Sequence, residues 1–275
     1  MNEVKKTYKN YVGGKYVRSE SGKTFRIELK NNFYEVPLTS RKDIRDAVVA
    51  AKKGFAGWQK LTPYNKTQVL YRLSEMLEGN IDTYQQILED SGLTKVKAKQ
   101  DIKMASDSLI WFAGMADKWE QMTGNLNPVA GDFFNISHQE SIGVIFSLNT
   151  NENSLNQLLL SILPSLTTGC SVISFSESNS ILALKLAEDI NNSDLPSGAL
   201  NIMSGNFSQV IDDVSNHVEI NAMAIYKDIT KDEKIIIREN ASKSLKRIFI
   251  KPSTSGLESL LPFLETKTVW HPKGR

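Results

Sequence analysis

The feature that most constrains this chain is a regular alternation of short β-branched runs with amphipathic segments, which begins near residue 142. Residues 144–175 show the repeating unit: an apolar run, a polar turn, an apolar helical stretch, a glycine and a second apolar run. Crossovers of this length connect neighbouring parallel strands, and such connections are right-handed. The pattern predicts an α/β fold with a parallel sheet flanked by helices, and with strands at 143–148, 171–175, 199–203, 222–225 and 247–250.

Helical patterns fill the region before this alternation. Ser40, followed three residues later by Asp43, has the form of a capping box and precedes apolar residues at helical spacing. Thr62-Pro63 opens a second helix, because proline is well tolerated in the first turn. A third helix is expected from about 93 to 120. We expect its inner side to carry Trp111, Phe112, Met115 and Trp119, as core residues rather than a binding platform.

Both ends of the chain have the alternation of apolar and polar residues that is typical of strands. Residues 8–38 form an expected β-arm around Gly13-Gly14 and Ser21-Gly22. Residues 265–271 read as a lone strand without a nearby hairpin partner. Such a strand must pair with a distant segment or with another chain.

Composition excludes several classes of function. The formal net charge is +2 at pH 7, with both signs interleaved, so we expect neither nucleic-acid nor membrane binding. One cysteine and three dispersed histidines argue against a disulfide and a metal site. Since the chain shows neither an apolar signal segment nor a membrane-length apolar run, we expect a cytoplasmic protein.

Short motifs along nearly the whole chain resemble the aldehyde dehydrogenase superfamily. They are Tyr11-Val-Gly-Gly-Lys-Tyr-Val17, Ala47-Val-Val-Ala-Ala-Lys-Lys-Gly-Phe-Ala-Gly-Trp58, Phe112-Ala-Gly-Met-Ala-Asp-Lys118, Leu163-Pro-Ser-Leu-Thr-Thr-Gly169, Leu195-Pro-Ser-Gly-Ala-Leu-Asn-Ile202 and Glu265-Thr-Lys-Thr-Val-Trp270. The resemblance implies a Rossmann-like coenzyme domain over 1–256, including a β-arm at about 8–38 and 127–140. It implies that 257–275 supplies the C-terminal strand of a small oligomerisation element formed by N- and C-terminal strands.

The resemblance also implies a missing catalytic apparatus. After Lys251-Pro-Ser-Thr-Ser-Gly256 the sequence jumps to the family's last strand and omits the segment that carries the nucleophilic cysteine. Cys170 has no neighbouring cation in sequence to activate it, so we expect a small buried thiol. The position of the family's general-base Glu falls on Lys251, which has the wrong charge for that task. We therefore expect no catalytic residues.

The positions that bind the oxyanion and the coenzyme in the family are altered as well. The amide that binds the oxyanion falls on Glu152, although Asn149, Asn151 or Asn153 could replace it after a small register shift; the plainer interpretation is that this polar cluster caps the helix beginning near Ser154. Of the residue pair that grips the ribose, Glu177 is kept and the lysine becomes Ser174 or Phe175. Lys227 and Asp232 stand where the family has phosphate-loop glycines. The cofactor-binding candidates are Asn151, Glu152, Ser174, Glu177, Gly205 and Lys227.

The sequence thus favours a degenerate family member that does not oxidise aldehydes. We expect no cofactor (NAD or NADP if any) and a role as an oligomeric scaffold or remnant, as a homodimer or larger assembly or mixed with a full-length aldehyde dehydrogenase. The alternative is a residual NAD(P)-dependent oxidoreductase or small-molecule binder. That alternative requires Asn149, Asn151, Glu152, Ser176, Glu177 and Lys227 to converge in the crevice.

Overall fold

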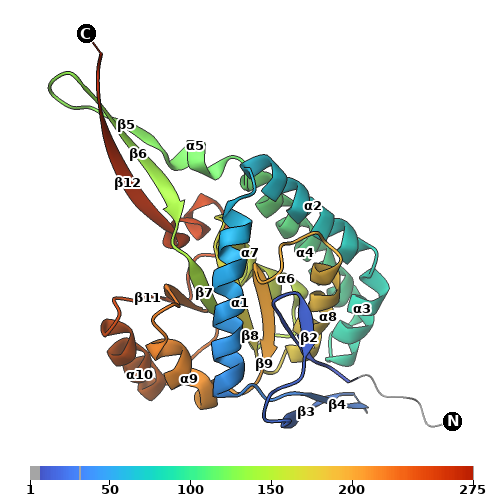
Figure 1. Cartoon of the computed structure of the whole chain (residues 1–275). Coiled ribbons are helices and arrows are strands. Elements are labelled where there is room, and N and C mark those ends of the chain that lie inside the picture. Colours follow the sequence, from blue (N-terminus) through green and yellow to red (C-terminus); the bar gives the residue numbers. More distant parts are fainter. Residues whose placement is uncertain (1–6, 31, 275) are drawn as a thin grey trace.

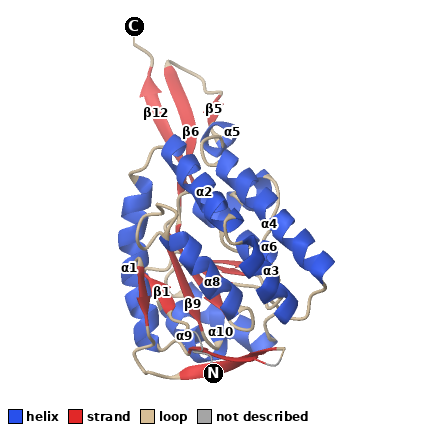
Figure 2. Ribbon diagram, turned by 90° about the vertical axis from the view of Figure 1, so that its right-hand side faces the viewer, coloured by secondary structure: helices blue, strands red, loops and turns tan. Residues whose placement is uncertain are grey.

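A computed structural model describes residues 7–30 and 32–274. Figure 1 shows a body of helices and strands with a narrow arm projecting from one end. A hairpin of β3 (Thr24–Leu29) and β4 (Asn32–Pro37) lies at the other end. Figure 2 shows the same separation from the side. Arm and hairpin are therefore separate elements, whereas the sequence placed the N- and C-terminal strands in one.

The body is built around a sheet whose central strands run parallel. These strands are β7 (Val144–Leu148), β8 (Ser171–Ser176), β9 (Leu200–Ser204), β10 (Ala222–Ile225) and β11 (Arg247–Ile250). Within the described residues the order is β11-β10-β7-β8-β9-β1-β2, with β1 (Asn10–Val12) and β2 (Lys15–Val17) added antiparallel at one side. The α/β class and the five predicted strands are confirmed, and the strand ends lie within one residue of the predicted ones.

Helices cover both faces of this sheet. On one face lie α1 (Arg41–Gln59), α9 (Phe207–Asn216) and α10 (Lys231–Ser242), and on the other α2 (Pro63–Glu78), α4 (Lys95–Met115), α6 (Leu155–Leu160), α7 (Leu163–Thr167) and α8 (Ser180–Asn191). Every residue of β8 is buried, as expected of a parallel strand packed on both sides.

The helix starts follow the predicted caps. Ser40 and Asp43 form a capping box at α1, and Thr62 caps α2 with proline in its first turn. The predicted helix at 93–120 is wrong in its extent, because this region forms two helices, α4 and the short α5 (Trp119–Thr123). A separate helix, α3 (Ile81–Asp90), lies before α4. Trp111 is 39% exposed and so departs from the predicted inner side.

Helix α1 packs against the backbone that leads into β9. A Cβ on Gly54 would lie 2.0 Å from the carbonyl carbon of Gly198, and a Cβ on Gly198 would lie 2.3 Å from the Ala50 carbonyl oxygen. Gly198 also has φ +85°, a conformation that favours glycine. Two glycines therefore set how closely the helix approaches the sheet.

The arm consists of β5 (Asn125–Asn127), β6 (Phe133–Ser141) and β12 (Leu264–Pro272), in the order β12-β6-β5. β12 pairs antiparallel with β6 from Leu264↔Ser141 to Pro272↔Phe133. The tail strand thus has a distant partner in its own chain. The N-terminal strands β1 and β2 belong to the main sheet and not to the arm. The Asn10 side chain accepts a hydrogen bond from the Ser204 backbone N–H (3.0 Å), which links β1 to β9.

Candidate functional site

The crevice expected to hold a ligand lies at the carboxyl ends of the parallel strands. The chain runs from β7 to β8 and β9 on one side and then returns to β10 and β11 on the other. Such a reversal is the point at which open α/β sheets bind ligands. Asn149, Glu177 and Lys227 follow β7, β8 and β10 there.

Asn149 is an internal cross-link between strands rather than a ligand-facing amide. Its Nδ2 donates to Ser174 Oγ (2.8 Å) and to Ser176 Oγ (2.7 Å), and its Oδ1 accepts from Ser161 Oγ (2.8 Å). Asn149 is 1% exposed and both serines of β8 are fully buried. Ser174, a predicted cofactor-binding residue, is therefore engaged inside the protein.

Glu177 and Lys227 meet across the end of β7. The Lys227 ammonium donates to Glu177 Oε2, and the Phe207 backbone N–H donates to Glu177 Oε1 (2.7 Å). The Lys227 ammonium also lies 5.8 Å from the centre of the Phe207 ring. The Glu177 and Lys227 side chains are only 20% and 12% exposed. Each oxygen of the Glu177 carboxylate thus accepts a hydrogen bond from within the protein. The donor to Oε1 is a backbone N–H at the positive N-terminus of α9.

Gly205 contributes to a small hollow beside this pair, of about 300 Å³, which is lined by Phe25, Leu38, Glu177, Ser178, Gly205, Asn206 and Gln209. A Cβ on Gly205 would lie 2.9 Å from Phe175 Cζ and 3.2 Å from the Thr39 backbone nitrogen. Glycine at this position therefore lets the segment before α1 approach β9. The space that a side chain at residue 205 would need is filled by Phe175 and Thr39.

Asn151 and Glu152 are exposed, and neither forms a hydrogen bond with Glu177 or Lys227. The Asn151 carbonyl accepts from Ser178 Oγ (3.0 Å). Glu152 lines a different hollow of about 530 Å³ beside α4, with Lys97 and Asp101 among its walls. The full convergence required by the small-molecule interpretation is not found. Within that set Glu177 meets Lys227 and Asn149 meets Ser176, but Asn149 and Ser176 are buried and Glu152 lines a different hollow.

The plainer interpretation, in which the asparagines and Glu152 cap the helix, is corrected by the structure, because the N-cap is the next residue, Ser154. Ser154 is the N-cap of α6 and accepts from the Gln157 backbone (3.1 Å). Asp101 of α4 accepts from the Leu155 backbone (2.7 Å), a contribution that the local sequence did not reveal. The sequence also missed the backbone N–H of Phe207 as a partner for Glu177. Asn206, the N-cap of α9, was the available signal.

Neither residue considered for catalysis lies in a reactive setting. Cys170 is fully buried, with Sγ 3.6 Å from the Phe263 carbonyl oxygen, and this burial raises the pKa of its thiol. Lys251 pairs with Asp228 at 2.7 Å on the surface. Within residues 7–30 and 32–274 there is no group of three or more His, Cys, Asp or Glu side chains placed to hold a metal ion. Nor does any helix of these residues combine the length and apolar composition of a membrane span.

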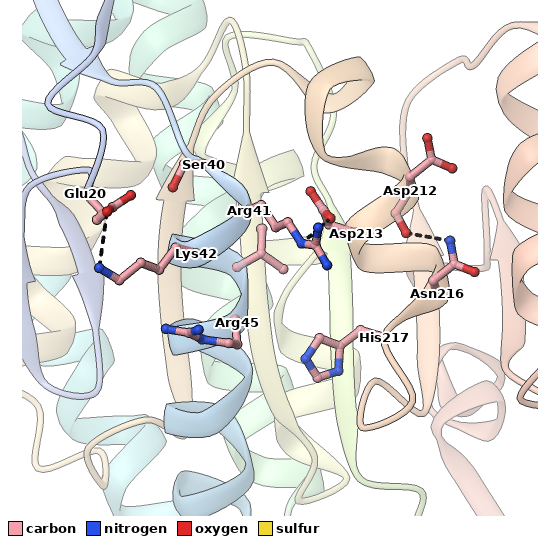
Figure 3. Close-up of a pocket in the computed structure, with 10 residues that line it drawn as sticks. Glu20, Ser40, Arg41, Lys42, Arg45, Asp212, Asp213, Asn216 and His217 are labelled. Atoms are coloured by element: carbon pink, nitrogen blue, oxygen red, sulfur yellow. Dashed lines mark hydrogen bonds and ion pairs between the residues drawn. The ribbon is translucent and has the colours of Figure 1, made fainter.

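A wider hollow of about 750 Å³ lies between the first turn of α1 and the end of α9 (Figure 3). Its charges balance one another: Arg41 pairs with Asp213 at 3.3 Å, and Lys42 pairs with Glu20 at 3.2 Å. The Arg41 side chain is 88% exposed. Solvated and mutually paired charges give this hollow no preference for a ligand of either sign.

Comparison with known proteins identifies the relatives of this chain. The model of the aldehyde dehydrogenase family matches residues 17–251. An aldehyde dehydrogenase of Davidiella tassiana is 28% identical over 248 residues, which cover 88% of this chain and 49% of that protein. Omega-crystallin of Enteroctopus dofleini is 28% identical over 260 residues, which cover 91% and 51%. The chain spans about half the length of the curated relatives it matches.

Solved structures share the fold. The NAD+ complex of an aldehyde dehydrogenase from Bacillus cereus has a TM-score of 0.82 at 22% identity, over 89% of this chain and 50% of that chain. A point mutant of betaine aldehyde dehydrogenase from Staphylococcus aureus has a TM-score of 0.80 at 23% identity, over the same shares. With the family model matching most of its length, this chain belongs to the aldehyde dehydrogenase family.

Proposed function

We propose that this protein is an aldehyde dehydrogenase-family member that neither oxidises aldehydes nor holds a dinucleotide, and that it acts as an oligomeric scaffold. The observation that carries the proposal is the Glu177–Lys227 ion pair at the carboxyl ends of the strands. The pair lies beside the reversal of strand order, where open α/β sheets bind ligands.

The residues present do not fit NAD or NADP. A ribose hydroxyl that donates to Glu177 would meet a carboxylate whose two oxygens already accept from Lys227 and from the Phe207 N–H. Displacing Lys227 separates a mostly buried ion pair, which costs free energy that the new hydrogen bond must offset. Lys227 itself stands where the resemblance places a glycine, so its side chain fills space that a phosphate would need. The missing ribose lysine has no replacement in Ser174, which is turned inward.

Catalysis lacks a nucleophile among the described residues. Thioester formation needs a thiolate that an aldehyde can reach, and the Cys170 thiol is fully buried with a raised pKa.

Calorimetry with NAD and NADP at millimolar concentration tests the cofactor part, with the expected result of no binding heat. Incubation with either nucleotide and a panel of aldehydes tests catalysis, with Cys170→Ser as the matched control. Reduction of the nicotinamide by the wild type that Cys170→Ser abolishes would overturn the proposal.

A second candidate is a small-molecule binder that uses the hollow beside Glu177 and Gly205. Its volume of about 300 Å³ is at the lower end of ligand pockets and suits a fragment smaller than a dinucleotide. Calorimetry with AMP and ATP distinguishes the candidates. Binding heat that decreases in the Glu177→Gln variant favours the small-molecule binder. The absence of binding heat with both nucleotides favours the scaffold.

The oligomeric part of the proposal is supported by the exposed apolar side chains of the arm. Those exposed by more than two-fifths are Leu126, Phe133, Phe134, Ile136, Val269 and Trp270. Exposed apolar side chains gathered in one place are typical of association surfaces. We expect a homodimer or larger, and light scattering that shows a stable monomer at micromolar concentration contradicts this. Association with a full-length aldehyde dehydrogenase is the variant that a pull-down with such a protein tests.

A further inference from the structure

The first turns of α4 carry a concentration of exposed positive charge, from Lys95, Lys97, Lys99 and Lys103. Within the described part of the chain, none of these ammonium groups forms an ion pair or a hydrogen bond. Asp101 lies in the same stretch, but it is turned toward α6, where it accepts from the Leu155 N–H (2.7 Å). Lys95, Lys99 and Lys103 follow one another every four residues and therefore form a row along one side of the helix. We call this row the lysine ridge.

These lysines lie where the electrostatics of a helix disfavours cations. Lys95 is the first residue of α4 and Lys97 is also in its first turn, at the positive end of the helix dipole. By contrast, α1 and α10 carry Asp43 and Asp232 in their first turns. Along the ridge, lysines four residues apart also repel each other. The arrangement therefore lowers the stability of the free protein, and such a local conflict is typical of a surface that serves binding.

An exposed apolar side chain lies beside the lysine ridge. Val96 is 76% exposed, and it precedes Lys99 by three residues and Lys103 by seven, which places it on the same side of the helix. Ile110, seven residues after Lys103, is 43% exposed and extends this side. The methylene stems of the lysines add further apolar surface. The ridge and Val96 together suit a partner that presents both carboxylates and an apolar side chain.

The ridge lies toward the end of the body that is remote from the arm. Asp90, four residues before the N-cap Thr94, pairs with Lys30 (2.6 Å), which directly follows β3 of the hairpin. Figure 1 shows the hairpin and the arm at opposite ends of the molecule. A partner on the ridge would therefore not compete with association through the arm.

Charge and spacing define what the ridge can hold. It is about 12 Å long, because eight residues of a helix rise by about 1.5 Å each. Carboxylates placed every four residues on a second helix have the same spacing of about 6 Å, so three of them can face the three lysines. Single exposed ion pairs contribute little, so a contact with Val96 is needed to hold such a helix. A nucleic acid is the other polyanion that lysines bind, but a net charge of +2 gives this chain no long-range attraction for it.

We infer that the lysine ridge and Val96 dock an acidic amphipathic helix of a partner protein, with carboxylates at four-residue intervals beside an apolar residue. This inference goes beyond the proposed function, because the partner is neither a second copy of this chain nor a full-length relative. It depends neither on the arm nor on the Glu177–Lys227 pair.

A synthetic peptide serves as the probe. It has about 18 residues, enough for a helix, with glutamate at every fourth position among leucines and alanines and a fluorescein label. The matched peptide has glutamine at each glutamate position. In fluorescence anisotropy we expect the glutamate peptide to bind at least tenfold more tightly than the glutamine peptide. Equal affinity for the two peptides, or no binding of the glutamate peptide at millimolar concentration, would overturn the inference.

Charge reversal in the protein tests the location. Lys99→Glu combined with Lys103→Glu should raise the dissociation constant of the glutamate peptide at least tenfold. The matched control combines Lys23→Glu with Lys53→Glu, at exposed lysines outside the ridge that form no ion pair in the described chain, and should change it less than twofold. Val96→Ser keeps the charge and should weaken binding several-fold. Equal weakening by the two double variants would reduce the effect to net charge and contradict a defined site.

Lys95→Glu distinguishes a binding role from a structural one. It places an anion at the positive end of the helix dipole and opposite Lys99, so we expect the melting temperature of the free protein to rise by about 2 °C while peptide binding weakens. A lower melting temperature would show that the lysine stabilises the fold and would overturn the argument. Tighter binding of a single-stranded oligonucleotide than of the glutamate peptide, lost in Lys99→Glu, would refute the assignment to a protein partner.

Discussion

Replacing Lys227 by Met and Glu177 by Gln, singly and together, measures the strength of the ion pair at the carboxyl ends of the strands. Two unit charges about 4 Å apart attract by about 4 kcal/mol at an effective dielectric constant of 20. Desolvation and side-chain ordering offset part of this attraction. With side chains 20% and 12% exposed, the pair falls between solvated pairs, which contribute about 0–1 kcal/mol, and buried ones, whose disruption costs about 3–5 kcal/mol. We expect a coupling free energy of about 2 kcal/mol.

Urea denaturation of the four proteins gives their free energies of unfolding, and the double-mutant cycle isolates the coupling. The matched control is Lys251 with Asp228, which lie 2.7 Å apart but are 57% and 93% exposed. That pair should couple by less than about 0.5 kcal/mol. A Glu177–Lys227 coupling no larger than the control would refute the proposal that this pair resists displacement by a ligand.

The other predictions concern the interior. Asn149→Ala leaves buried serine hydroxyls without their partner and should lower the free energy of unfolding by about 3 kcal/mol, whereas Asn151→Ala at an exposed position should change it by less than about 0.5 kcal/mol in urea denaturation. Gly54→Ala forces a Cβ into backbone at 2.0 Å and should destabilise by more than about 3 kcal/mol, while Gly57→Ala, whose Cβ meets only a proline side chain at 3.7 Å, should stabilise by up to about 1 kcal/mol through helix propensity. Cys170 should resist thiol reagents until the protein unfolds. Because burial raises its pKa above 9.0, the folded state keeps a proton that the unfolded chain loses, so the wild type should lose stability relative to Cys170→Ser only as the pH rises above about 9.

Regular elements were predictable because local patterns report burial and caps directly. A strand such as β8, buried on both faces, must be apolar or small throughout, and Ser40 with Asp43 fits a known helix start. The end of the long helix was harder, because α4 and α5 are separated by only a short turn. Local pattern therefore gives an element's existence more reliably than its ends.

The site itself could be predicted only in part, because it depends on contacts between distant segments. Asn149 and Asn151 are the same residue type two positions apart, yet one is 1% exposed and the other lies on the surface. What separates them is whether Ser161 and Ser174 lie within reach. The pairing of Glu177 with Lys227 likewise spans 50 residues and depends on the strand order.

The pairing of β6 with β12 bears on the order in which the molecule assembles. Ser137 and Thr268, hydroxyl neighbours at 3.0 Å, are 131 positions apart along the chain. Closing so long a loop is entropically unfavourable until the intervening residues have condensed. The body must therefore become compact before β12 can pair with β6. A substitution that slows the folding of the body will leave the β12 edge of β6 unpaired for longer. During that time the edge can pair with a strand of a neighbouring molecule.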